Sequence, residues 1–64
     1  MNDTTKHALR YVKYADGNAT KKHFIEDHDP IGEVLWSALT GLVWLDENDK
    51  ILLTEAGKQE LINL

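Results

Sequence analysis

The sequence predicts a mainly helical α+β fold with one small β-ribbon, in the order helix, helix, helix, strand, strand, helix. Apolar residues recur at helical spacing in the first half of the chain and again after Pro30. Two short apolar runs, 42–45 and 50–53, stand on either side of the polar segment 46–49, a pattern typical of paired strands. Because the chain is long enough for only one core, we expect a single domain over residues 1–64.

The first helix is predicted to run from Thr5 to Ala15. A side-chain cap can come from Asn2, Asp3 or Thr4, whose oxygens accept the free backbone N–H groups of a first turn. We expect its buried stripe to consist of the apolar residues at helical spacing, which are Ala8, Leu9, Val12 and Ala15.

The second helix is predicted from Lys21 to Asp27, with Thr20 as its cap. Its only large apolar side chains are Phe24 and Ile25. A helix this short is not stable alone in water, so we expect its stability to come from packing against its neighbours.

The third helix is predicted from Pro30 to Thr40, with Asp29 as cap and Pro30 in the first turn, where the missing N–H has no consequence. Gly41 ends it. The face turned to the core would carry Ile31, Leu35, Ala38, Leu39 and then Leu42. The outward face would carry Glu33, Trp36, Ser37 and Thr40.

Strand alternation in the ribbon places Val43 and Leu45 on one face and Trp44 on the other, beside Leu52. After Thr54, a last helix is predicted over residues 55–63. We expect it to bury Ala56, Leu61 and Leu64.

This order of elements resembles the winged helix-turn-helix superfamily, and two stretches carry the resemblance. Residues 39–43, LTGLV, resemble the end of a recognition helix that runs into the first wing strand. Residues 53–57, LTEAG, resemble the segment where the second wing strand enters the final helix. The resemblance covers about residues 8–62.

The resemblance implies a DNA-binding, transcription-associated regulator whose third helix enters the major groove. Such a module would act as a dimer, since one weakly basic copy would bind DNA too weakly alone. The DNA-contacting residues that it implies are Lys21, Lys22, Glu33, Ser37 and Thr40, with Lys50 on the wing.

The charge distribution favours a different function. The net charge is −4, and the whole excess of acidic residues lies after residue 29. The predicted third helix has no Lys or Arg, whereas phosphate contacts by these residues supply most of the affinity for DNA. The alternative is therefore a non-enzymatic protein-interaction module, for instance a small regulatory or phage-type accessory or inhibitor protein.

In that alternative, the partner-binding residues would be Trp36, Trp44 and Leu52, because exposed apolar patches and tryptophans mark many interfaces. The bland interpretation is that both indoles belong to the protein's own core. The basic stripe of Lys6, Arg10 and Lys13 is typical of a solvated helix face, although it could also contact an acidic surface or a phosphate backbone.

Several other classes of function are not expected. The sequence has no cysteine, and its three histidines are not at the spacings that zinc sites use, so we expect no metal and no cofactor. No catalytic constellation can be argued from spacing, and we expect neither an enzyme nor a small-molecule substrate. With no long apolar run and no secretory pattern after Met1, we expect a cytoplasmic protein without membrane contact.

Overall fold

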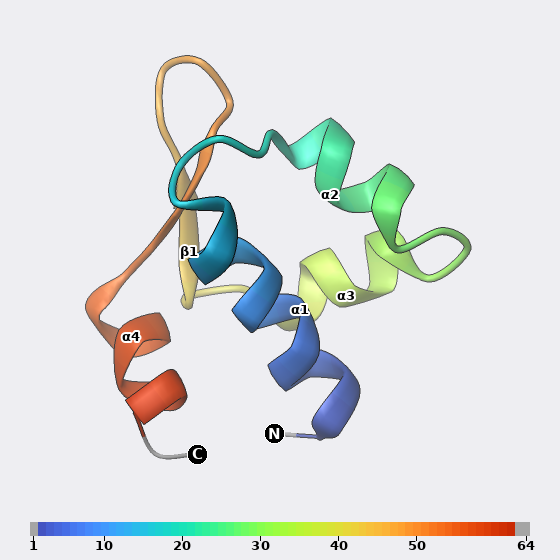
Figure 1. Cartoon of the computed structure of the whole chain (residues 1–64). Coiled ribbons are helices and arrows are strands. Elements are labelled where there is room, and N and C mark those ends of the chain that lie inside the picture. Colours follow the sequence, from blue (N-terminus) through green and yellow to red (C-terminus); the bar gives the residue numbers. More distant parts are fainter. Residues whose placement is uncertain (1, 63–64) are drawn as a thin grey trace.

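The computed structural model describes residues 2–62 and has a mainly helical fold with one two-stranded antiparallel sheet (Figure 1). It confirms the predicted fold class and the predicted order of elements. The elements are α1 (Asp3–Ala15), α2 (Lys21–Asp27), α3 (Gly32–Ala38), β1 (Val43–Leu45), β2 (Ile51–Leu53) and α4 (Glu55–Ile62).

Helix α1 begins at Asp3, two residues before the predicted start. Its cap is Asn2, one of the three predicted candidates, whose side chain accepts a hydrogen bond of 2.8 Å from the backbone N–H of Thr5. Its buried stripe packs against α3, α4 and β2. Together with residues from α2, α3 and β2, this stripe forms one hydrophobic core, made of Ala8, Leu9, Val12, Phe24, Leu35, Leu39 and Ile51.

The two strands form an antiparallel ribbon in which Trp44 is paired with Leu52. Ile51 is 1% exposed whereas Trp44 is 50% exposed, so the ribbon has one core face and one outer face, as the alternation predicts. The turn is held by the Asp46 carboxylate, which accepts hydrogen bonds from the backbone N–H groups of Asn48 and Lys50 at 2.8 and 2.9 Å.

A short bridge that the sequence does not predict attaches the start of α2 to the ribbon. Thr20 pairs with Lys50 in antiparallel fashion, and the Ile51 N–H donates to the Ala19 carbonyl at 2.9 Å. Thr20 also caps α2 as predicted, since its hydroxyl accepts from the His23 N–H at 3.1 Å. The first turn of α2 is therefore held beside the ribbon turn.

Helix α3 is shorter than predicted at both ends. The Ile31 N–H donates to the His28 carbonyl at 3.0 Å, so residues 28–31 form a turn and the helix begins only at Gly32. The predicted cap by Asp29 with Pro30 in the first turn is wrong, because the N-cap is Ile31 and no side chain caps the helix. Gly41 has φ +84°, as expected after a helix end, but the helix already ends at Ala38.

The phase of α3 also differs from the prediction. Its buried positions are Gly32, Leu35 and Leu39, which leaves Ile31 45% exposed and Ala38 exposed. Gly32 sets this phase because an added Cβ would lie 2.3 Å from the Ile25 carbonyl oxygen, a distance that only glycine allows.

In helix α4, too, a glycine in close contact with another segment decides which face is buried. A Cβ at Gly57 would lie 2.1 Å from the Leu42 carbonyl oxygen, so Gly57 and not Ala56 faces the interior. Leu61 packs against the core as predicted, whereas the prediction for Ala56 is wrong. The predicted end of this helix at residue 63 and the predicted burial of Leu64 lie outside the described residues.

The contact of Gly32 with α2 gives a test of the fold. We expect Gly32→Ala to destabilise the protein by about 2–3 kcal/mol, because the new methyl group forces the backbones of α2 and α3 apart. Val34→Ala is the control in the same helix, since Val34 is 70% exposed, and should change stability by less than about 0.5 kcal/mol. Urea unfolding measures both, and equal stability of the two variants would contradict the close contact.

Candidate interaction surfaces

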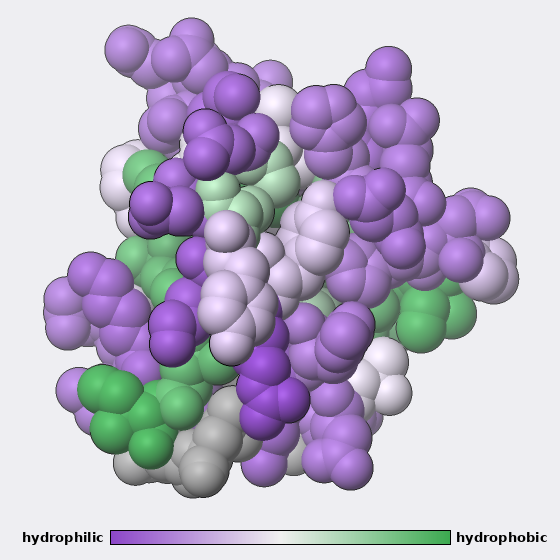
Figure 2. Space-filling model, viewed as in Figure 1, coloured by the Kyte–Doolittle hydropathy of each residue, from purple (hydrophilic) through white to green (hydrophobic). Residues whose placement is uncertain are grey.

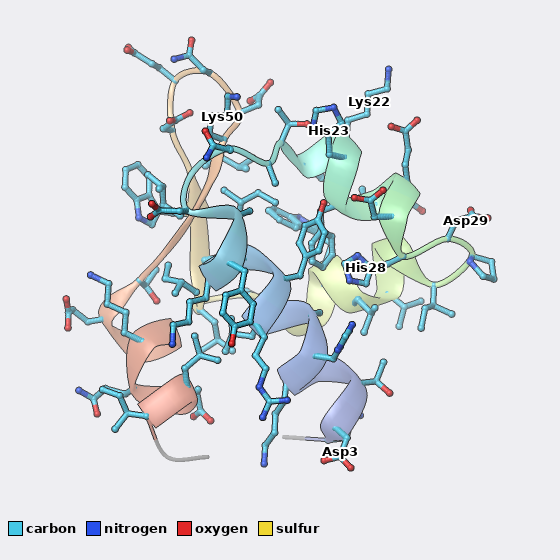
Figure 3. The ribbon with its side chains drawn as sticks, in the orientation of Figure 1. Asp3, Lys22, His23, His28, Asp29 and Lys50 are labelled. Atoms are coloured by element: carbon cyan, nitrogen blue, oxygen red, sulfur yellow. The ribbon has the colours of Figure 1, made fainter. Side chains whose placement is uncertain are left out.

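The first turn of α2 presents a basic surface. Lys21, Lys22 and His23 are all exposed there. Figure 3 shows Lys22 and His23 close together, at the end of the molecule where the ribbon turn lies and opposite to Asp3. Within residues 2–62 the structure has one ion pair, between Lys58 and Glu55 at 3.6 Å, so both lysines keep their charge available for a ligand.

Lys21 connects this basic surface with α3, because its Nζ lies 5.5 Å from the ring centre of Trp36. The prediction that Trp36 faces outward is wrong. The indole is partly buried and packs edge-to-face on Phe24, with 5.7 Å between ring centres and an interplanar angle of 66°. The shifted phase of α3 turns Trp36 inward.

Phe24 itself lies at the centre of an aromatic cluster that joins three elements. It is completely buried and contacts Tyr11 from α1 at 5.7 Å and His28 from the end of α2 at 4.3 Å. His28 Nδ1 lies 2.7 Å from the Phe24 carbonyl oxygen, which holds the imidazole against the phenyl ring. The cluster is a structural feature, since it has no open face for a ligand at Phe24.

The outward face of α3 carries the predicted Glu33 and Ser37, and both are exposed. Thr40 is also exposed, but its hydroxyl donates to the Ser37 carbonyl at 2.7 Å and so helps to end the helix. The same face exposes Val34, which the sequence reasoning did not assign to any surface, and Ile31, which it placed in the core. Hence the exposed face of α3 carries one acid, no base and two large apolar side chains.

Lys50 does not lie at the tip of the ribbon, where the sequence places it. Its side chain is partly buried, and its Nζ lies 3.5 Å from the Asn18 carbonyl oxygen in the connection between α1 and α2. The bridge between Thr20 and Lys50 draws this residue to the base of the turn. The exposed tip therefore consists of Glu47, Asn48 and Asp49.

A groove of about 700 Å³ separates α2 from the ribbon turn. Its apolar floor includes Ile25 and Leu45, and charged side chains of both signs stand around it, among them Lys22 and Asp49. The mixed charge gives the groove no strong preference for an anionic or a cationic small molecule.

The outer face of the ribbon is a second candidate surface, and the predicted outward position of Trp44 on it is confirmed. Trp44 is half exposed and lies beside the partly buried Leu52. These two side chains line a hollow of about 330 Å³ together with Lys13, Gly17 and other residues of α1 and α4. Figure 2 shows two further hydrophobic areas on the visible face, over α4 and beside the turn that joins α2 to α3.

The described part of the chain does not bring three His, Asp or Glu side chains into a group that could hold a metal ion. Between residues 2 and 62, no helix has both the length and the apolar character that crossing a membrane requires. No family model matches this chain, and no curated protein or solved structure matches it either.

Tyr11 is the residue whose ionisation is most altered. It is partly buried between α1 and α2, and its hydroxyl donates to the Asp27 carboxylate. Burial, and after it the hydrogen bond to Asp27 and the negative charge of Asp27, raises the pKa of Tyr11 from 10.0 to about 12. The neutral phenol is therefore favoured in the folded protein.

This shift predicts a specific loss of stability in alkali. The contribution of Tyr11 is complete below pH 10 and disappears as the pH rises toward 12, because the raised pKa favours the protonated form in the folded state. At pH 8 we expect Tyr11→Phe to lower the free energy of unfolding by about 1 kcal/mol. The gap to the wild type should close between pH 10 and pH 12.

Urea unfolding at a series of pH values measures this gap. Tyr14→Phe is the matched control, because Tyr14 is 78% exposed and should show no gap at any pH. A stability difference between Tyr11→Phe and the wild type that does not depend on pH would contradict the raised pKa of Tyr11.

Proposed function

We propose that this chain is a DNA-binding module of the winged helix-turn-helix type that acts in transcription regulation. Lys21 and Lys22 contact phosphates, and α3 lies in the major groove. The observation that carries the proposal is the pair of exposed lysines on the first turn of α2, of which Lys21 reaches Trp36 of α3. The bridge from Thr20 to the ribbon supports it, since it holds α2 and the ribbon turn at one end of the molecule.

The acidic ribbon turn opposes DNA binding less than its sequence suggests. The Asp46 carboxylate accepts two backbone N–H groups and so has a structural role in the turn. On α3, the Ser37 hydroxyl is free to contact a base edge, and Glu33 can accept a hydrogen bond from a cytosine amino group. Because only a few Lys and Arg side chains are available for phosphate contacts, we expect the affinity of one copy for DNA to be low and strongly dependent on salt.

The lysines of α2 give the direct test. We expect the wild type to bind random-sequence duplex at about 20 mM salt and to lose affinity steeply as salt rises. Lys21→Ala with Lys22→Ala should reduce the slope of log affinity against log salt by about 2, one unit for each lost phosphate contact. Fluorescence polarisation with a labelled duplex measures both quantities.

The matched control is Lys6→Ala with Arg10→Ala, which removes the same charge from α1. This variant should keep nearly the wild-type slope, because Lys6 and Arg10 lie on a different helix from the proposed contacts. Absence of binding at about 20 mM salt would overturn the proposal, since non-specific attraction is strongest there. A larger loss of affinity in the α1 variant than in the α2 variant would show that DNA contacts α1 and not the first turn of α2.

The position of His23 leads us to expect that DNA binding depends on pH. Imidazole side chains generally gain a positive charge as the pH falls below neutral, and His23 lies next to Lys22 on the basic surface. We expect tighter duplex binding at pH 5.5 than at pH 7.5, and a smaller difference for His23→Gln. His7→Gln, on α1, is the control. An identical response of the wild type and His23→Gln would show that His23 does not face phosphate.

A second candidate function is protein docking through α3, and the exposure of Val34 and Ile31 favours it. These apolar side chains stand beside the acidic Glu33. A partner with an apolar groove and a basic rim would match this face. Failure to bind DNA at low salt, combined with a stable fold, would favour this second function over the first.

A further inference from the structure

The outer face of the ribbon continues into α1 and α4 as one surface. Two adjoining hollows, of about 330 and 430 Å³, share Lys13, Asp16, Leu53 and Lys58 along their common border. The first hollow reaches Trp44 and the second reaches α4. We call this the ribbon–α4 surface, and its apolar members are Trp44, Leu52, Leu53, Leu61 and Ile62.

Two apolar side chains of this surface are largely exposed to solvent and do not belong to the core. Trp44 is 50% exposed and Ile62 is 72% exposed, and they stand at the two ends of the surface. Helix α1, strand β2 and helix α4 each contact the other two, so three elements meet here. A tryptophan in such a place is typical of the centre of an interface.

The charges around the ribbon–α4 surface favour a partner that also carries both signs of charge. Two cations, Lys13 and Lys58, and one anion, Asp16, line it, and a second anion, Glu55, stands at its edge in an ion pair with Lys58. A strongly acidic or strongly basic partner would meet like charge at half of these positions. A second copy of the same surface, turned by a two-fold axis, can set the cations of each chain against the anions of the other.

We propose that two copies of this chain associate through their ribbon–α4 surfaces as a two-fold symmetric dimer. Lys21 and Lys22 are not part of this surface, so the dimer leaves both basic surfaces free. The consequence for DNA rests on the proposed function: two copies double the number of phosphate contacts and read two half-sites. The association itself does not require that function.

The small size of the chain limits the area that the proposed dimer can bury. A stable interface takes about 800 Å² from each partner, which is about a fifth of the 4269 Å² surface of this chain. Because the surface mixes exposed charges with a few apolar side chains, we expect weak association, with a dissociation constant in the micromolar range. A concentration series from about 5 to about 500 μM therefore spans the transition.

Analytical ultracentrifugation without DNA measures the association. The wild type should pass from the mass of one 7.3-kDa chain to twice that mass across the series. Two variants carry like charge on the surface. Lys13→Glu with Lys58→Glu makes it acidic, and Asp16→Asn with Glu55→Lys makes it basic. Asparagine is chosen at residue 16 because it tolerates the left-handed φ of 49° found there.

Each charge variant alone should remain monomeric at about 500 μM, because two like-charged surfaces repel. An equimolar mixture of the two should recover the double mass, which a merely unfolded variant could not do. Val34→Glu adds a charge to the exposed face of α3 and serves as the control that should still dimerise. Circular dichroism shows whether each variant is folded.

A wild type that stays monomeric up to about 500 μM overturns the proposal, and so does a mixture that stays monomeric while the wild type dimerises. The outcome is separate from that of DNA binding. A dimer that ignores duplex DNA would refute only the DNA function, and a monomer that binds duplex with a steep salt dependence would refute only the dimer.

Discussion

The complete burial of Phe24 is the interaction on which the rest of the structure depends. Helix α2 has few apolar residues of its own, and Phe24 is the side chain that joins it to α1 and α3. Burial of a phenylalanine contributes roughly 1.5–3 kcal/mol, and favourable aromatic contacts add about 0.5–1.5 kcal/mol each. For so small a chain these amounts are a large part of the net stability. This contact fixes α2 against α3 together with the close approach of Gly32 to the Ile25 backbone.

The position of α2 decides which residues reach the surface. Gly32 lets the backbone of α3 approach the Ile25 carbonyl closely, and this approach sets the rotation of α3 about its axis. That rotation turns Trp36 toward Phe24 and brings Val34 to solvent. The proposed docking face of α3 is therefore a consequence of a glycine contact with the preceding helix.

The same packing changes the meaning of several charges. Asp46 is used by the ribbon turn, and Lys50 is held at the base of the turn near Asn18. The sequence alone places Lys50 on the wing and gives Asp46 no structural role. In the folded chain Lys21 and Lys22 are exposed on the first turn of α2, and Lys21 reaches Trp36 of α3. The balance between DNA binding and protein docking depends on this placement and not on the net charge.

Local signals in the sequence were enough to determine α1, α2 and the ribbon. Asn2 and Thr20 cap their helices through atoms within three residues, and strand alternation places Trp44 outside because its period is a property of the backbone. The rotation of α3 could not be predicted, because it depends on contact between Gly32 and a residue of another helix. The tertiary structure alone decided that Trp36 turns inward, where Lys50 lies and which surface of α3 is apolar, since each of these follows from packing between different elements.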